Sequence, residues 1–301
     1  MQISTHKKKP LFSVVLPTRD RAEMLRRAVS SVLRQSLRDF ELIIVDDGST
    51  QPCAADLFED PRVQIIRNPA SLGVAHARNL GVDAARGTYI SFLDDDDEYL
   101  DSFLSSTYAR LKDSPDEIGV SWCGVKQLDY SPDGCPSERS IEFPVYEDRR
   151  ALIADFFSIG LSFGFAAKAR CLKKVGPFDC TLKVASDTDF FFRVLTRGFV
   201  PAVVPGVHVV RHIHLGARLT ASGLHRERIR TWEEWLFVQY SGFLRQYPAL
   251  EGGLRDYVDS LKKELGDAKI PEQNPYIHST PAIRLPSRFF MFRDWFARLA
   301  Q

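Results

Sequence analysis

The first hundred residues alternate short apolar runs with stretches of helical periodicity, and this alternation constrains the fold more than any other feature. The apolar runs predict strands at Phe12–Leu16, Phe40–Val45, Val63–Ile66 and Tyr89–Leu93. Strands that alternate with helices favour a parallel, doubly wound sheet, whose strands are apolar because helices cover both faces. We therefore expect an α/β fold with a Rossmann-like, mostly parallel central sheet.

The segments between these strands carry helix signals. Pro17 is expected to end the first strand, and Asp20 with Glu23 forms a predicted capping box for the next helix. A second helix is predicted over 70–85, with Arg86 and Gly87 as its C-terminal signal. The segment 131–150, rich in Pro, Gly and charge, is expected to be a loop. The first helix is expected to bury Leu25, Ala28, Val29, Val32 and Leu33.

Composition narrows the classes of function. The 301 residues carry a formal net charge of +1, so no global field attracts nucleic acid. The five cysteines are odd in number and form no CxxC pair, which predicts neither a zinc site nor a disulfide framework. Residues 1–10 are polar and basic and are expected to be a disordered N-terminus. They are not expected to be a signal peptide, because they lack its apolar region. Reduced cysteines predict a cytoplasmic enzyme, and with no run of 18 apolar residues no segment is expected to span a membrane.

Four consecutive aspartates, Asp94 to Asp97, follow the fourth predicted strand. Their mutual repulsion costs stability unless a cation or a donor-rich loop compensates it. Carboxylates at i and i+2 can face the same side and hold Mg²⁺ or Mn²⁺, leaving positions free for phosphate oxygens. The alternative is a solvated acidic turn that caps a helix beginning near Leu100. The preceding buried strand favours the metal site, because ligands bind at the carboxyl edge of such sheets.

A second acidic pair, Asp46-Asp47, follows the second predicted strand. The same edge of the sheet should therefore carry both clusters. A carboxylate here can accept the imide N–H of uracil, whereas the alternative is an ordinary Asx turn.

Taken together, three segments resemble glycosyltransferase family 2, whose members have the GT-A fold. They are SVVLPTRDRAEMLRRAVSSVLRQSLRDFELIIVDDGST, LGVAHARNLGVDAARGTYISFLDDDDEYL and FGFAAKARCLKKVGPFDCTLKVASDTDFFFRVLTRGF. The resemblance covers roughly residues 11–220, in the order and spacing of the family. It implies a GT-A domain over 11–220, with a nucleotide-sugar half (11–130) and an acceptor half (131–220). A helical C-terminal extension over 221–301 is expected to follow.

The resemblance also implies roles for single residues of the donor site. Asp94-x-Asp96 matches the DxD motif, with Asp96 as the main metal ligand and Asp95 near the ribose, while Asp97 is assigned to the turn. His214 matches a histidine that binds the metal or the diphosphate, and His212 is the competing choice. The residues expected to bind the nucleotide sugar are Pro17, Arg19, Asp47, Arg78, Asp94 and Asp95.

On the acceptor side, Asp187 matches the family's general base. The acidic residue that usually precedes this base is Ser186 here, which removes a charge that would raise the pKa of Asp187. Asp189 is the alternative base. Both aspartates would also stabilise the N-terminus of the helix that follows, so helix stability predicts the same residues as catalysis.

The resulting hypothesis is an inverting, metal-dependent glycosyltransferase that uses Mn²⁺ or Mg²⁺. It would move a sugar from a nucleoside-diphosphate donor to a hydroxyl acceptor, a glycan or lipid-linked saccharide in surface polysaccharide synthesis. UDP is the default nucleotide, with GDP and dTDP as alternatives. The alternative from another class is a non-catalytic module that binds a nucleotide sugar or a protein partner.

The C-terminal third is aromatic. Trp232, Trp235, Phe237 and Tyr240 are expected in the core rather than at a sugar. In the tail Arg288–Leu299, the residues Phe289, Phe292, Phe296 and Leu299 fall on one helical face. Such a helix could rest on the inner face of an anionic membrane, or pack on the enzyme's own core or in a homodimer.

Overall fold

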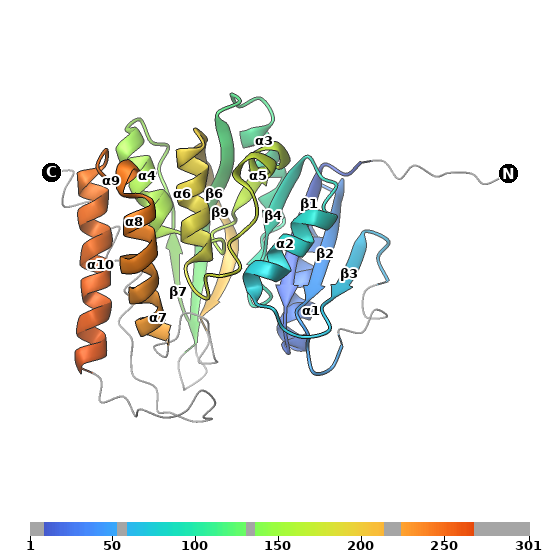
Figure 1. Cartoon of the computed structure of the whole chain (residues 1–301). Coiled ribbons are helices and arrows are strands. Elements are labelled where there is room, and N and C mark those ends of the chain that lie inside the picture. The colour runs from blue at the N-terminus through green and yellow to red at the C-terminus, as the bar shows by residue number, and fades with distance from the viewer. Residues whose placement is uncertain (1–8, 53–58, 131–135, 214–223, 268–301) are drawn as a thin grey trace.

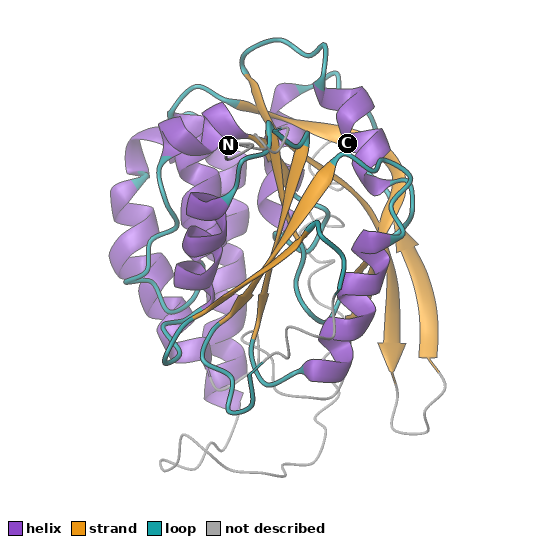
Figure 2. Cartoon of the chain, turned by 90° about the vertical axis from the view of Figure 1, so that its right-hand side faces the viewer, coloured by secondary structure: helices purple, strands orange, loops and turns teal. Residues whose placement is uncertain are grey.

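The computed structural model describes residues 9–52, 59–130, 136–213 and 224–267. In these ranges a nine-stranded sheet runs through the middle of the molecule, in the order β3-β2-β1-β4-β8-β6-β9-β5 with β7 beside β6. Helices lie on both sides of the sheet (Figures 1 and 2). The expected α/β fold with a helix-flanked central sheet is confirmed.

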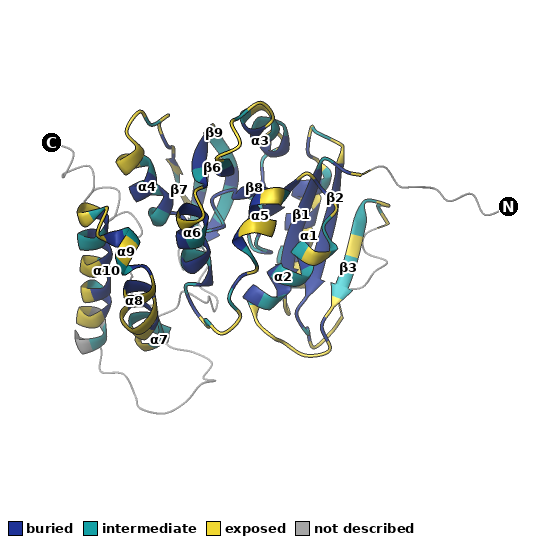
Figure 3. Ribbon diagram, turned by 45° about the horizontal axis from the view of Figure 1, so that its top comes forward, coloured by how far each residue is buried: buried dark blue, intermediate teal, exposed yellow. Residues whose placement is uncertain are grey.

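The first half of the sheet is parallel. Its strands are β1 (Phe12–Thr18), β2 (Phe40–Asp46), β3 (Val63–Arg67) and β4 (Tyr89–Phe92). β1 pairs with β2 and β4, and β2 pairs with β3. β1, β2 and β4 are buried along their whole length, whereas the outer strand β3 is partly exposed (Figure 3). All four predicted strands are present, and this burial explains their apolar composition.

The prediction that Pro17 ends the first strand is wrong, because β1 continues to Thr18. The carbonyl of Val15 accepts a hydrogen bond from Leu93 on the β4 side. Backbone groups alternate in direction along a strand, so the nitrogen of Pro17 faces that same side. Pairing with β4 already stops at Val15 and Phe92. A proline there removes no ladder hydrogen bond.

The capping box is also wrong. Helix α1 (Ala22–Leu33) begins after Arg21, with no side-chain cap. Asp20 has a left-handed φ of 53°, and its carboxylate accepts a hydrogen bond of 2.7 Å from the backbone N–H of Thr50. A contact with the loop after β2 therefore occupies this side chain. The apolar face of α1 is confirmed, with Leu25, Ala28, Val29 and Val32 buried and Leu33 packed against the core.

Helix α2 (Val74–Ala84) is shorter than predicted at its N-terminus, because residues 68–73 form a loop. Its C-terminus lies close to the predicted one. Gly87, however, does not cap this helix, and another contact explains why a glycine stands there. A Cβ on Gly87 would lie 2.5 Å from the backbone nitrogen of Ser13. Gly87 thus permits a close approach to β1.

The second half of the sheet is mixed. Its strands are β5 (Glu98–Tyr99), β6 (Ile118–Tyr130), β7 (Pro136–Ile141), β8 (Ala166–Lys168) and β9 (Val200–Ile213). β8 is antiparallel to both β4 and β6, whereas β6 and β9 are parallel. The predicted loop over 131–150 is wrong in part, because β7 and the start of α4 (Arg149–Ser158) lie in it. β7 pairs with β6 alone, and such an edge strand needs no apolar run.

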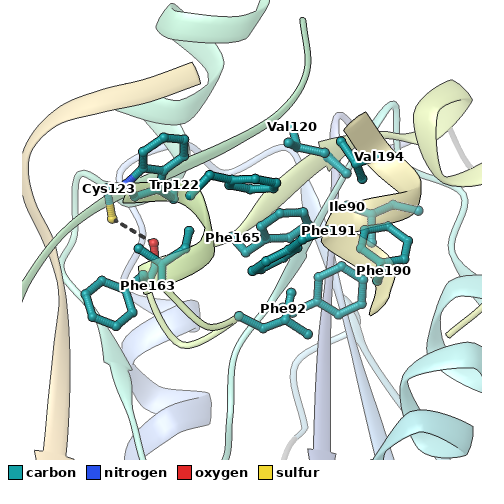
Figure 4. Packing of buried hydrophobic residues seen from close by; sticks show 14 of the residues in the cluster. Ile90, Phe92, Val120, Trp122, Cys123, Phe163, Phe165, Phe190, Phe191 and Val194 are labelled. Atoms are coloured by element: carbon teal, nitrogen blue, oxygen red, sulfur yellow. Dashed lines mark hydrogen bonds between the residues drawn. The ribbon is translucent and has the colours of Figure 1, made fainter. Parts of the chain in front are cut away.

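The remaining helices complete the larger of the two apolar clusters in the described residues, while Ile43, Val45 and Ala77 form the smaller one. These helices are α3 (Phe103–Leu111), α5 (Ala169–Val175), α6 (Ser186–Thr196), α7 (His225–Arg230), the π-helix η3 (Thr231–Leu236), α8 (Phe237–Gln239), α9 (Ser241–Leu244) and α10 (Pro248–Asp267). Phe165 and Phe191 stack at the centre of the core, with centroids 5.3 Å apart (Figure 4).

The C-terminal helices extend this core. Tyr240 stacks on Phe192 of α6, with ring centroids 4.4 Å apart. Trp232 and Phe237 are buried as expected, but the prediction is wrong for Trp235, which is 41% exposed. The helical extension is thus confirmed as far as Asp267. Within the described ranges no helix combines the length and the hydropathy that crossing a membrane requires.

Candidate active site

The four aspartates follow β4 at the carboxyl edge of the sheet and do not act as one group. The backbone N–H of Asp97 donates to the carbonyl of Asp94 over 3.2 Å, which closes a tight turn. The turn brings one carboxylate oxygen from each of Asp94, Asp96 and Asp97 within 4.8 Å of one another. Asp97 therefore belongs to the carboxylate cluster as well as to the turn to which the sequence assigned it.

Asp95 points away from this cluster. Its carboxylate accepts hydrogen bonds from the Thr18 hydroxyl at 2.8 Å and from the Arg21 guanidinium at 3.0 Å. Only 5% of the residue is exposed. Burial raises the pKa of Asp95 to about 6, although Arg21 and Thr18 favour its ionised form. The expected ribose contact would require this buried carboxylate to leave its two partners.

Arginines surround the cluster. Arg78 of α2 donates to Asp94 over 2.8 Å, and Arg21 lies 3.2 Å from Asp96. Arg27 donates to the backbone carbonyl of Asp96 over 2.7 Å. Sequence reasoning singled out Arg78 but missed Arg21 and Arg27. Their signal was available, because four adjacent carboxylates require nearby cations, and Arg21 directly precedes the first helix while Arg27 lies in it.

The arginines do not neutralise the site completely. Burial raises the pKa of Asp97 to about 8, and the neighbouring Asp96 and Asp94 raise it further while Arg211 opposes them. Carboxylates held together in this way would suit a divalent cation, whose positive charge would favour their ionised forms. Three hard oxygen donors fit Mg²⁺ or Mn²⁺. The cluster Asp94, Asp96 and Asp97 can therefore hold such an ion.

Asp47 lies at the end of β2 and anchors the loop before α2. One oxygen accepts from Asn68 at 2.7 Å and from the backbone of Leu72 at 3.0 Å. The other accepts from Ser71 at 2.7 Å and from the backbone of Gly73 at 2.9 Å. Burial by itself raises the pKa of Asp47, but these hydrogen bonds outweigh it and lower the pKa below its ordinary value. One donor would have to yield before Asp47 could accept from a base.

Pro17 and Arg19 are the two other residues predicted to bind the nucleotide, and they lie at the end of β1. Pro17 is buried within β1, next to Val45 of β2. Arg19 follows the strand, its side chain is 57% exposed and it lies 3.7 Å from Asp20. Of the two, only Arg19 offers its side chain to solvent.

On the acceptor side, the structure separates Asp187 from Asp189. Both oxygens of Asp189 are occupied, by Arg193 at 2.8 Å and by the Tyr240 hydroxyl at 2.6 Å. Asp189 is 3% exposed and links α6 to the C-terminal helices. Asp187 is half-buried in the first turn of α6, and one of its oxygens accepts from the backbone of Thr188 at 2.9 Å. Asp187 is therefore the better candidate for a base.

The histidines are likewise unequal. His214 lies outside the described residues. His212 is buried, with Nδ1 2.8 Å from the Tyr130 hydroxyl and Nε2 2.8 Å from Glu98. Both ring nitrogens have protein partners, so the alternative that His212 binds the metal does not fit. His212 instead fixes the end of β9, and its backbone N–H donates to Asp97 over 3.0 Å.

A family model described as glycosyl transferase family 2 matches residues 13–168, more than half of the chain. The chain belongs to glycosyltransferase family 2. A relative in Escherichia coli (strain K12) is 31% identical over 219 residues, which cover 70% of this chain and 75% of the relative. This relative, WcaA, is described as a glycosyl transferase of colanic acid biosynthesis. GlyG of Streptococcus pneumoniae is 31% identical over 114 residues, 36% of this chain but only 38% of GlyG.

Solved structures place this family 2 chain among GT-A folds. TarS of S. aureus (residues 1–349), in complex with UDP-GlcNAc, superposes with a TM-score of 0.57 and 18% identity. The match covers 72% of this chain and 64% of the TarS chain, less than two thirds of its length. Members of family 2 bind a nucleotide-sugar donor. The GT-A fold and the family expected from the sequence are both confirmed.

Proposed function

We propose that this family 2 member is an inverting glycosyltransferase that transfers a sugar from a UDP-sugar to a hydroxyl acceptor. The observation that carries the proposal is the cluster of Asp94, Asp96 and Asp97 at the carboxyl end of β4. A UDP-sugar is supported by the complex of TarS with UDP-GlcNAc. An acceptor in surface polysaccharide synthesis is supported by the assignment of WcaA to colanic acid biosynthesis.

On the donor side, the mechanism must offset the negative charge of the leaving diphosphate. Asp94, Asp96 and Asp97 would hold Mn²⁺ or Mg²⁺, which when bound supplies positive charge to the leaving diphosphate. Arg78 and Arg21 hold the carboxylates in place. Arg19, Asp47 and Pro17 are the proposed nucleotide side of the site. His214 remains a proposed ligand of the metal or the diphosphate.

The acceptor half is a proton transfer. The Asp187 carboxylate takes the proton of the acceptor hydroxyl as its oxygen forms a bond to the anomeric carbon. The bond from that carbon to the diphosphate oxygen breaks, and the diphosphate leaves with the electron pair. One displacement of this kind inverts the anomeric configuration.

The experiment measures cleavage of UDP-sugars by the full chain with Mn²⁺ and with EDTA, for the wild type, Asp187→Asn and Asp96→Ala. We expect cleavage that requires the metal and falls by at least about a hundredfold in each variant. Asp113→Asn and Asp101→Ala are matched controls, because these aspartates are exposed on the surface. UDP binding without cleavage in a folded wild type would favour the non-catalytic module, and near-normal rates in a variant would remove that residue's role.

We further propose that the enzyme works at the cytoplasmic face of the membrane, where a lipid-linked acceptor would lie. The amphipathic segment Arg288–Leu299, which lies outside the described residues, supports this proposal through its sequence alone. Removing this segment should abolish co-sedimentation with anionic liposomes. Equal partitioning of the two forms would favour packing on the core or a homodimer.

A further inference from the structure

The segment between α4 and β8, residues 159–165, reaches the same edge of the sheet as the aspartates. β8 is antiparallel to β4, so the start of β8 lies beside the carboxyl end of β4. The backbone N–H of Phe92 donates to the carbonyl of Phe165 over 3.2 Å, two residues before Asp94. This segment therefore adjoins the proposed donor site.

The segment is held firmly on the core. Leu161 and Phe163 are buried, and Ser162 between them is half-exposed. The carbonyl of Phe163 accepts from the backbone N–H of Cys123 at 3.0 Å and from its thiol at 3.7 Å (Figure 4). The N–H of Phe163 in turn donates to the carbonyl of Gly160 over 3.1 Å. Gly160 and Ser162 thus have fixed positions.

Gly160 leaves a space beside the proposed base. A Cβ at Gly160 would lie 3.6 Å from Asp187 Oδ2 and 3.8 Å from Ser162 Oγ, with no other heavy atom of the described residues within 4 Å apart from its chain neighbours. Both oxygens therefore face one point. In the described part of the chain, neither Asp187 Oδ2 nor the Ser162 hydroxyl has a hydrogen-bond partner.

The glycine is not required by the backbone. Its φ lies outside the left-handed region, and the contacts of an added Cβ are ordinary van der Waals distances. An alanine would fit the folded protein. A space that the fold does not need, lined by two unpaired oxygens, is suited to a ligand that brings its own hydroxyl groups.

We propose that Gly160 and Ser162 form the part of the acceptor site that receives the reacting alcohol, which we name the Gly160–Ser162 cradle. This inference rests on the proposed function. The acceptor hydroxyl occupies the space at Gly160 and donates its proton toward Asp187 Oδ2, while Ser162 hydrogen-bonds a second oxygen of the acceptor. Gly160 then sets how bulky an alcohol can approach, and Ser162 is a positioning residue. Water, being smaller, can react without the cradle.

The test compares an alcohol with water as nucleophile. The full chain is incubated with Mn²⁺, UDP-GlcNAc or UDP-glucose, and glycerol, and the ratio of glyceryl glycoside to free sugar is measured. For Gly160→Ala we expect this ratio to fall about tenfold, through a higher KM for glycerol, because one added methyl group fills the space. For Ser162→Ala we expect a fall of about fivefold, because one hydrogen bond is lost. Hydrolysis of the donor by water is measured in the same incubations, so that a general loss of activity is distinguished from a loss of the reaction with glycerol.

The control is Gly242→Ala in α9, where an added Cβ would meet only the Arg245 side chain at 3.8 Å. It should leave the ratio unchanged, and none of the three variants should melt at a lower temperature than the wild type. An unchanged ratio in Gly160→Ala and Ser162→Ala would overturn the cradle while the proposed function stands. A wild type that cleaves the donor but forms no glyceryl glycoside would overturn it too. A wild type that cleaves neither donor would remove the proposed function and the cradle with it.

Discussion

The hydroxyl of Thr18 at the end of β1 donates to the carboxylate of Asp95 over 2.8 Å, although 77 residues separate the two in the chain. The bond joins the ends of β1 and the β4 turn. It also turns Asp95 away from its three neighbours, which leaves Asp94, Asp96 and Asp97 to form the carboxylate cluster.

Thr18→Val should destabilise the protein, because it leaves one oxygen of a buried carboxylate without a donor. We expect the free energy of unfolding, measured with urea, to fall by about 1–3 kcal/mol. Thr196→Val is the control, since the hydroxyl of this exposed residue bonds the carbonyls of Phe192 and Arg193 in its own helix. Equal effects of the two substitutions would contradict the special role of the Thr18–Asp95 bond.

Asp97→Asn and Asp95→Asn should differ in metal binding. Asparagine at 97 can still accept the hydrogen bond from His212 but loses the charge of a proposed ligand. We expect Mn²⁺ affinity in the presence of UDP, measured by titration calorimetry, to fall at least about tenfold. Asp95→Asn should change that affinity much less, because its carboxylate lies with Thr18 and Arg21. The reverse order would show that Asp95, rather than Asp97, belongs to the metal site.

Asp47 should make the fold sensitive to acid. Its pKa in the folded protein is lowered from the ordinary value of 3.8, so the folded state favours the ionised carboxylate. The resulting stability is present above the unfolded pKa and is lost as the pH falls through the folded one. Asp47→Asn should therefore cost about 1–3 kcal/mol near neutral pH, and less as the pH falls below about 4.

Urea unfolding of the wild type and Asp47→Asn across this pH range checks that prediction. Asp113→Asn, whose side chain is 85% exposed, serves as the control. A stability difference that stays constant with pH would mean that the charge of Asp47 does not hold the loop Asn68–Gly73.

Tyr240→Phe should affect stability without affecting catalysis. The substitution keeps the stack on Phe192 but removes the hydroxyl that donates to Asp189 over 2.6 Å. We expect a loss of about 1–3 kcal/mol in unfolding free energy. The rate of donor cleavage should match the wild type, and Tyr247→Phe at a half-exposed position should change neither quantity. A large loss of donor cleavage in a folded Tyr240→Phe variant would make Asp189 a candidate base again.

Local pattern was sufficient for much of the fold. The four apolar runs became β1 to β4, and the buried face of α1 followed the predicted spacing. The predictions failed where a distant partner decided the outcome. Asp20 bonds Thr50 instead of capping α1, and the polar strand β7 exists only because β6 pairs with it.

The sequence by itself determined that acidic residues stand at the carboxyl ends of β2 and β4, because strand periodicity and chain direction are local properties. Only the tertiary structure decided which partners each aspartate has. Asp95 differs from Asp97 because Thr18 and Arg21, 77 and 74 residues away, reach one and not the other. Asp187 differs from Asp189 because Tyr240 closes over the latter. Adjacent identical side chains carry the same local signal, and long-range partners give them different burial and different hydrogen bonds.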